Sequence, residues 1–504
     1  MNHNLYSLLQ SRFPNDPEAT WIQTADGEQL RYSDIDEATA RYAGALVAQG
    51  VEAGDRVLVQ IEKSPQTLIL YLATLRVGAI FVPLNTAYTP TEVAYFLGDA
   101  KPRLFIARPE NETGLIPAAR DANTHLLTFD SNGSGSFADT LAGVEPVQEI
   151  ATVSPDDVAT IIYTSGTTGR SKGAMLSHDN LASNALTLID LWGFRETDTL
   201  LHALPIYHVH GLFVAVHCAM LCGIPMRFLP KFDADEVMRQ LPDITVMMGV
   251  PTFYTRLLQT PGFDRDCCRH MRLFISGSAP LLEQTWAHFH DQTGHQILER
   301  YGMSEAIMIA SNPYEGERVA GTVGFALPGV TIRICDSDNQ SLPAGETGVL
   351  QMRGPNVFKG YWQMPEKTAS EFTDDGFFIS GDMARMDTEG RVTIVGREKD
   401  LVISGGLNIY PKEIEEAIDA LDGVNETAVI GVPHADLGEG LVAVIRPDSD
   451  ADIDPEALIA TLKSQLAGFK VPRKIFTVDE LPRNSMGKVQ KNVLRDRFAK
   501  VFDE

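Results

Sequence analysis

The sequence has too little positive charge to bind nucleic acid or an anionic membrane over a broad surface. Its 504 residues include 42 Lys and Arg against 67 Asp and Glu, which gives a formal net charge of −25. Such a surplus repels polyanions and favours solubility. Any site for an anion must therefore concentrate positive charge locally.

Cysteines and long apolar runs are also scarce. The five cysteines form an odd set without a Cys-x-x-Cys pair, so they favour neither a disulfide framework nor a zinc site. The first residues lack a basic segment followed by an apolar stretch, and no window approaches the roughly 20 apolar residues of a membrane span. We therefore expect a soluble, unexported, cytoplasmic protein with no nucleic-acid or membrane partner.

The sequence does contain short apolar runs that alternate with helical patterns. A helix is predicted over residues 65 to 76, and Thr89, Pro90 and Glu92 are typical of a capping box that starts a second helix. Such alternation is typical of an α/β fold, with parallel sheets covered by helices. Strands are predicted at residues 57–63, 79–84, 103–107, 273–276, 330–335 and 349–353.

The pattern changes after Asp382, where two strands flank a charged turn and a helix starts at Pro411. A chain of this length exceeds what one hydrophobic core serves. We expect a large N-terminal body, residues 1–398, and a small mobile α+β C-terminal domain, residues 399–504. The charged turn between them suits a hinge, because hinges are a few loop positions that absorb backbone rotation.

Residues 163–173, YTSGTTGRSKG, predict a strand that opens into a loop able to wrap a polyphosphate. The loop differs from a Walker loop, because Arg170 and Ser171 separate Gly169 from Lys172. A second lysine, Lys488, lies far downstream in PRNSMGKVQK. Together the two lysines indicate the two phosphate-handling ends of one nucleotide-dependent enzyme.

Six segments in a fixed order extend this interpretation, at residues 163–173, 300–305 (RYGMSE), 358–362 (FKGYW), 379–385 (ISGDMAR), 396–416 (GREKDLVISGGLNIYPKEIEE) and 482–491. From about residue 20 to its end, the chain resembles the adenylate-forming acyl-CoA synthetases. The resemblance implies their fold and their use of ATP, Mg²⁺ and coenzyme A. In that reaction a carboxylate attacks the α-phosphorus and pyrophosphate leaves; the thiol then attacks the acyl-adenylate and AMP leaves. Catalysis would rest on positioning and charge stabilisation, without a protein nucleophile.

The resemblance also implies roles for single residues on the nucleotide side. Tyr301 would stack on adenine, Asp382 would accept the ribose hydroxyls, and Arg397 would contact ribose or phosphate. Glu305 would be the metal-side carboxylate, since magnesium prefers oxygen ligands. The β- and γ-phosphates would be held by Thr164, Ser165, Gly166, Thr167, Thr168, Gly169 and Lys172, with Thr164 also near the metal; Gly277, Ser278, Ala279, Gly302, Met303 and Ser304 would complete the nucleotide site.

Lys488 would bridge the reacting carboxylate and the α-phosphate. The small domain would then rotate about a hinge at Lys399, so that Gly405 and Gly406 line the pantetheine tunnel, where missing side chains leave room for a thin ligand. Family members often carry this lysine acetylated, which removes its charge. A lysine acetyltransferase and a deacetylase acting on Lys488 are thus implied partners.

The acid substrate is predicted from Arg300, which stands where many relatives that accept bulky acids have glycine. Arginine fills that space and offers a bidentate fork suited to a second carboxylate. This favours a short dicarboxylic acid, and malonate above others. His208 and His210 would add polar character to the pocket, with His208 also a candidate catalytic residue, and Arg256 is a weaker candidate for the acid.

Several alternatives remain open. A methyl branch adds only about 1 to 3 kcal/mol of discrimination, so methylmalonate or another short acid is a second possible substrate. A stand-alone amino-acid adenylating enzyme is disfavoured, because the pocket lacks an acid partner for an α-ammonium and the chain ends at Glu504, soon after Lys488. A luciferase-like oxidation needs a larger apolar cavity than Arg300 leaves. An inactive nucleotide-binding scaffold is disfavoured because every phosphate and metal residue is present.

Overall fold

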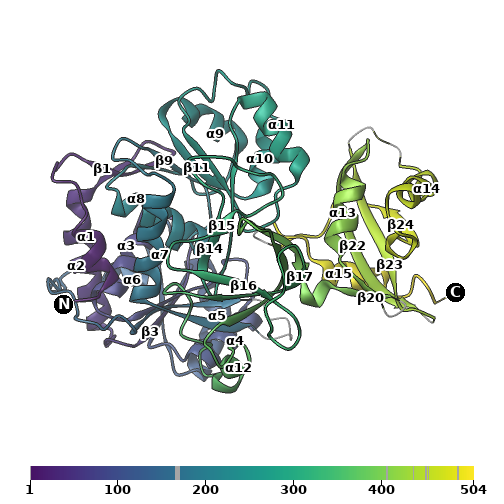
Figure 1. Ribbon diagram of the computed structural model, residues 1–504. Coiled ribbons are helices and arrows are strands. Elements are labelled where there is room, and N and C mark those ends of the chain that lie inside the picture. The colour runs from purple at the N-terminus through teal and green to yellow at the C-terminus, as the bar shows by residue number, and fades with distance from the viewer. Residues whose placement is uncertain are drawn as a thin grey trace.

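The computed structural model describes nearly the whole chain, as a large body and a smaller C-terminal lobe (Figure 1). The predicted α/β fold class, a large body of sheets with a small C-terminal domain, is confirmed. The described residues are 2–164, 171–404, 407–434, 436–448, 451, 453–484 and 487–503.

Two mainly parallel sheets form most of the large body. The first has the strand order β6 (His125–Thr128), β5 (Leu104–Ala107), β3 (Arg56–Gln60), β4 (Ile80–Pro83), β7 (Val158–Thr164) and β8 (Lys172–Ser177), in which only β7 and β8 pair antiparallel. The second has the order β15 (Phe325–Ala326), β14 (Ile307–Ser311), β13 (Leu298–Met303), β12 (Leu273–Ser276), β11 (Val246–Gly249), β9 (Leu200–His202), β10 (Met226–Phe228), β1 (Thr20–Thr24) and β2 (Gln29–Arg31).

A third, antiparallel sheet completes this body and leads to the C-terminal lobe. Its order is β16 (Thr331–Cys335), β17 (Thr347–Arg353), β18 (Phe378–Met386) and β19 (Val392–Arg397). The helices of the body are α1 (Leu5–Gln10), α2 (Tyr32–Ala48), α3 (Pro65–Arg76), α4 (Pro90–Ala100), α5 (Glu112–Asp121), α6 (Ser136–Thr140), α7 (His178–Leu191), α8 (His217–Leu221), α9 (Ala234–Gln240), α10 (Pro251–Leu258), α11 (Glu283–Thr293) and α12 (Pro365–Ser370), with short turns η1 (Pro109–Asn111) and η3 (Leu241–Asp243).

Local signals in the sequence place several of these elements correctly. Helix α3 has the predicted bounds. The predicted capping box at α4 is confirmed: the Thr89 hydroxyl accepts a hydrogen bond from the Glu92 N–H at 3.4 Å, and the Glu92 carboxylate accepts one from the Thr89 N–H at 2.8 Å. Pro90 occupies the first helical position, where its missing N–H costs nothing.

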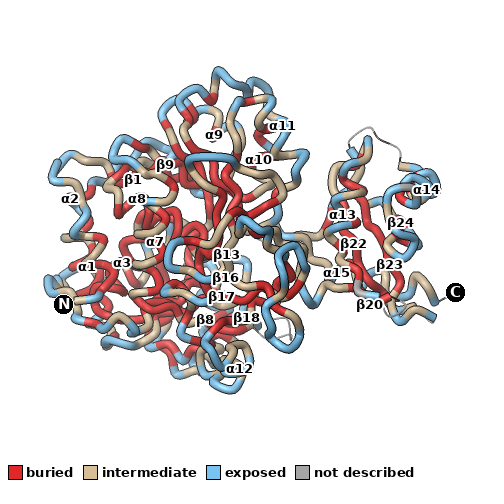
Figure 2. Tube along the Cα trace, in the orientation of Figure 1, coloured by how far each residue is buried: buried red, intermediate tan, exposed pale blue. Residues whose placement is uncertain are grey.

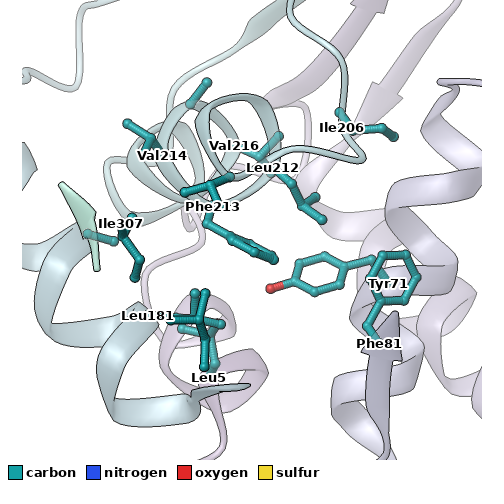
Figure 3. Close-up of a cluster of buried hydrophobic side chains, with 14 of the residues drawn as sticks. Leu5, Tyr71, Phe81, Leu181, Ile206, Leu212, Phe213, Val214, Val216 and Ile307 are labelled. Carbon is teal, nitrogen blue, oxygen red and sulfur yellow. The ribbon is translucent and has the colours of Figure 1, made fainter. Parts of the chain in front are cut away.

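One continuous hydrophobic core joins the three sheets of the large body, and it appears as the red interior of the left part of Figure 2. Part of it packs around a π-helix, η2 (His210–Val216). Figure 3 shows Phe213 from this helix facing Tyr71 and Phe81, and the Tyr71 and Phe81 ring centroids are 5.0 Å apart. The Tyr71 hydroxyl also lies 2.9 Å from His217 Nε2. These contacts pack the π-helix, which begins at His210, against α3 and β4.

The C-terminal lobe has its own sheet, with the order β21 (Leu407–Ile409), β20 (Val402–Ser404), β23 (Gly438–Pro447) and β22 (Val424–His434), and with β24 (Lys474–Thr477) parallel to β23. Side chains of β22 alternate between two apolar clusters, with Val429 facing α13 and Ile430 facing α15. The sheet is therefore covered on both faces. Its helices are α13 (Pro411–Asp419), α14 (Pro455–Gln465) and α15 (Lys491–Phe498), with the turns η4 (Glu398–Asp400) and η5 (Gly468–Lys470).

The lobe contacts the large body at several points. The Lys412 ammonium donates to the Ile394 carbonyl at 2.7 Å, and the Gln284 side-chain amide donates to the Asp419 carbonyl. The predicted hinge coincides with η4, but the boundary at residue 398 itself stays a prediction. Within the described ranges, none of the helices combines the length and apolar character that a membrane span requires.

Candidate active site

Strand β13 places the residue predicted to select the acid. Arg300 pairs with Ser311 of β14, and the neighbouring Glu299 pairs with Ser276 of β12. The Arg300 side chain is 3% exposed. The strand therefore holds a guanidinium inside the protein, next to the loop that follows β12.

That loop makes room for the guanidinium through Gly277. A side-chain carbon at Gly277 would overlap the Arg300 guanidinium. Two guanidinium nitrogens of Arg300, Nε and Nη2, are buried without a hydrogen-bond partner among the described residues. Desolvation lowers the pKa of Arg300 to about 9, while Tyr254 and Glu299 act to raise it. Since buried donors are almost always satisfied in native proteins, these two point to an acceptor supplied from outside the chain.

Two histidines lie on the same side. His210 is 1% exposed, its Nδ1 lies 3.2 Å from the Ser278 hydroxyl, and its Nε2 has no partner in the described part of the chain. Burial first, and then the nearby Arg300, lower the pKa of His210 well below its usual value, and the pKa of His208 falls to about 3 through burial, Lys488 and Arg300. Both rings are therefore neutral at physiological pH. Ser278 has a φ of +71°, a strained conformation that is typical of functional sites.

The residues predicted for adenine and ribose form one bonded group. The Tyr301 hydroxyl donates a hydrogen bond to Asp382, and Arg397 Nε lies 2.6 Å from the other oxygen of this carboxylate. Asp382 and Arg397 face each other across β18 and β19. Asp382 is 3% exposed. Sequence analysis predicted these residues separately, and the structure brings them together.

Lys488 faces the same region from the C-terminal lobe. The adjacent Gly487 approaches the Thr252 side chain of the large body. Desolvation and then Arg397 lower the pKa of Lys488 to about 8, while Asp382 and Glu305 act to raise it. The Lys488 side chain remains exposed to solvent, which moderates this desolvation. Because both Arg397 and Arg300 influence its pKa, Lys488 lies near the predicted nucleotide residues and near Arg300.

Lys172 and Glu305, predicted to bind phosphate and metal, belong to a cluster that sequence analysis missed. Lys172 is 3.0 Å from Glu371 Oε1, and the Tyr361 hydroxyl contacts both Glu371 and Glu305. The motif FKGYW was noticed in the sequence, but no side chain in it was given a role. Glu371 carries no local signal, because 199 residues separate it from Lys172.

Glu305 fits a magnesium site in its donor chemistry. It is a buried carboxylate, 7% exposed, and the Tyr361 hydroxyl lies 3.1 Å from its Oε1. Among the described residues, no group of three or more His, Cys, Asp or Glu could hold a metal ion by itself. Magnesium usually keeps waters and substrate phosphates in its shell, so one protein carboxylate suits it.

The remaining predicted residues are placed as follows. Thr164 ends β7 and pairs with Lys172 of β8, and Lys399 lies exposed in η4. Arg256 is exposed and lines a cavity of about 340 Å³ whose walls include Lys63 and Phe232 but not Arg300. Gly302, Met303 and Ser304 lie at the turn from β13 to β14, and Ala279 follows Ser278; Ser165, Gly166, Thr167, Thr168, Gly169, Gly405 and Gly406 lie outside the described residues.

Comparison with known proteins adds independent findings. The model of the AMP-binding enzyme family matches residues 9–362, and the model of the AMP-binding enzyme C-terminal domain matches residues 413–488. A malonate–CoA ligase of Arabidopsis thaliana is 34% identical over 492 residues, which cover 91% of this chain and 80% of that protein.

Solved structures of MatB from Rhodopseudomonas palustris match the whole of both chains at 53% identity. The TM-score is 0.97 for the ATP-bound form and 0.85 for the apo form. The arrangement of this chain is therefore more similar to the ATP-bound form of that protein.

Proposed function

The chain belongs to the AMP-binding enzyme family, and on that premise we propose that it is a malonate–CoA ligase. It joins malonate to coenzyme A with ATP and gives malonyl-CoA, AMP and pyrophosphate. One carboxylate of malonate attacks the α-phosphorus, and pyrophosphate leaves. The coenzyme A thiol then attacks the carbonyl carbon of malonyl-adenylate, and AMP leaves.

The observation that carries the choice of acid is the buried Arg300 guanidinium with its two unpartnered nitrogens. A second carboxylate supplies the acceptors that these donors lack, and the charge-assisted pair is stronger than a neutral hydrogen bond. An apolar acid would leave the buried charge unpaired, which is costly. The malonate–CoA ligase of Arabidopsis thaliana among the relatives supports the same acid.

The neutral histidines support this assignment as well. His210 Nε2 is a further buried polar atom with no partner within the described ranges, and His208 lies near both Arg300 and Lys488. A short diacid that reaches from Lys488 to Arg300 would pass these rings. We assign His208 and His210 to the wall of the acid pocket.

On the nucleotide side, Asp382 would accept the ribose hydroxyls and Tyr301 would cover the adenine. Lys172 and the loop before it would bind the β- and γ-phosphates, while Lys488 would stabilise the charge that builds on the α-phosphate. Glu305 and Thr164 would hold Mg²⁺, which neutralises charge on the polyphosphate. ATP-bound MatB, whose arrangement this chain matches closely, supports the nucleotide assignment.

We further propose that the small lobe, residues 399–504, rotates about Lys399 between the two half-reactions, and that Gly405 and Gly406 then line the pantetheine tunnel. The exposed side chain of Lys488 is accessible to a lysine acetyltransferase and a deacetylase, which would switch off the first half-reaction. The five cysteines are free thiols, which supports a reducing, cytoplasmic location.

An ATP/pyrophosphate exchange assay over acetate, malonate, methylmalonate, succinate and benzoate tests the proposal. Exchange should be fastest with malonate, and methylmalonate should follow, because one methyl group discriminates weakly. Exchange with malonate no faster than with acetate would refute the dicarboxylate assignment.

A further inference from the structure

The segment at residues 358–362 joins the two sides of the phosphate site through its backbone. The Trp362 N–H donates to the Gly173 carbonyl of β8 at 2.8 Å, and the Phe358 N–H donates to the Glu305 carbonyl at 2.8 Å. Strand β8 begins with the phosphate lysine. The segment therefore fixes the distance between that lysine and the metal-side carboxylate.

A side chain of the same segment continues this connection. The Tyr361 hydroxyl lies 2.6 Å from Glu371 Oε2 and 3.1 Å from Glu305 Oε1, so its single proton is shared between the two carboxylates. Its ring lies under Lys172, with the ammonium 4.2 Å from the ring centroid. Tyr361 is 3% exposed, so these contacts are shielded from water.

Glu371 holds the lysine from a second side. Its Oε1 lies 3.0 Å from the Lys172 ammonium and 2.7 Å from the ammonium of Lys367. The Lys172 side chain is 10% exposed, whereas that of Lys367 is 39% exposed. A lysine ammonium has three donors, so Lys172 can keep its bond to Glu371 and still donate to a phosphate oxygen.

We propose that Tyr361 and Glu371 are positioning residues for MgATP. Glu371 orients the Lys172 ammonium toward the phosphates, and Tyr361 orients the Glu305 carboxylate toward the metal. This inference rests on the proposed function and deepens it at the same site. A lysine held in place before binding loses less conformational freedom when ATP arrives, and a hydrogen-bonded carboxylate is held in one orientation.

The first test is Glu371→Gln, with MgATP affinity measured by calorimetry in the absence of any acid. We expect affinity to fall about tenfold, and KM for ATP in pyrophosphate exchange to rise by a similar factor while KM for malonate stays within about twofold. Lys367→Gln is the matched control, because it removes the other ammonium from the same carboxylate and should leave MgATP affinity within about twofold. Unchanged MgATP affinity in folded Glu371→Gln overturns the role of Glu371.

Glu371→Asp is a second variant at this position. It keeps the negative charge, but its side chain is one methylene shorter, so the carboxylate lies farther from Lys172. Its MgATP affinity should lie between wild type and Glu371→Gln, and its thermal unfolding should resemble wild type. Wild-type affinity in both Glu371 variants, or equal losses in KM for ATP and for malonate, would contradict positioning of the phosphate lysine.

Tyr361→Phe tests the proposed role of Tyr361 in orienting Glu305, because it removes the hydroxyl and keeps the ring under Lys172. In calorimetric titrations of ATP at increasing Mg²⁺, the midpoint should move to about tenfold higher Mg²⁺, while affinity for ATP without metal stays within about twofold. A Mg²⁺ midpoint equal to that of wild type overturns the role of Tyr361.

Different results would refute the choice of malonate and the positioning role of Glu371 and Tyr361. If the wild-type protein supports no pyrophosphate exchange with malonate but Glu371→Gln still weakens MgATP binding, the choice of acid is wrong and the positioning role stands. If the wild-type protein is active with malonate and both variants bind MgATP as it does, the positioning role alone is wrong.

Discussion

The nucleotide side and the acid side of the site differ in how their polar groups are satisfied. Asp382 bonds to both Tyr301 and Arg397, so its carboxylate is held in place by the protein itself. In contrast, Arg300 and His210 present buried nitrogens with no partner among the described residues. The proposed nucleotide side is thus preorganised by its own contacts, while the proposed acid side leaves buried donors for a guest to satisfy. The second kind of site discriminates sharply, because a guest without the right acceptors leaves a buried charge unpaired.

Lys488→Ala should have the largest effect, since Lys488 lies near residues of both sides. Loss of its ammonium should lower pyrophosphate exchange by about 10³-fold, because the developing charge on the α-phosphate loses its counterion. Conversion of supplied malonyl-adenylate to the thioester should change by no more than a few-fold. Equal losses in both half-reactions would contradict the division of labour between two lobe positions.

Arg300→Gly should separate the two sides. We expect kcat/KM for malonate to fall by about 100-fold or more, the usual result of breaking a buried charge pair, while MgATP affinity stays within about twofold. Arg300→Lys is a useful control, because it keeps the charge but loses the bidentate fork. Its kcat/KM for malonate should lie between those of wild type and Arg300→Gly. If malonate kinetics were unchanged in Arg300→Gly, the side chain could not face the acid.

Gly277→Ala tests the boundary between the nucleotide side and the acid side of the site. Sequence analysis predicted Gly277 for the nucleotide site, and in the structure an added side-chain carbon at this position would meet the Arg300 guanidinium. We therefore expect KM for malonate to rise about tenfold, and KM for ATP to change little, because the displaced guanidinium is the end of a flexible side chain. The effect should disappear in the Arg300→Gly background, as a double-mutant cycle would reveal. A rise in KM for ATP alone would return Gly277 to the nucleotide side.

The pH dependence should give the smallest effect. The Lys488 ammonium is charged below its pKa of about 8 and neutral above it. The adenylation kcat/KM should therefore be constant at lower pH, halve near pH 8 and fall about tenfold for each further unit, since this parameter reports the free enzyme. Lys488→Arg stays charged over this pH range. Its adenylation kcat/KM should therefore be lower than that of wild type but should not decline above pH 8. A decline of the same shape in Lys488→Arg would assign it to another group.

Contiguous signals made much of the fold predictable. The bounds of α3 and the capping box at Thr89 follow from residues within one or two helical turns of each other. The α/β class followed from alternation alone, and the motif order indicated residues that the structure brings together, Tyr301, Asp382 and Arg397. Local chemistry and a family resemblance were sufficient for these features.

The remainder depends on contacts between distant parts of the chain. The bond between Lys172 and Glu371 spans 199 residues, and the π-helix that begins at His210 has no signature that the sequence revealed. Nothing in the sequence indicates that the Arg300 guanidinium fills the space that a side chain at position 277 would need. Such roles follow from packing, which a linear pattern does not encode.

Arg300 and Tyr301 are consecutive residues of one hydrogen-bonded strand, β13. Neighbouring side chains of a strand point to opposite faces, about 3.3 Å apart along its axis. If Arg300 binds the acid and Tyr301 the nucleotide, as proposed, the strand fixes the spacing between the two ligands. A longer diacid would then need a shorter side chain at position 300, because the backbone between these two residues cannot stretch.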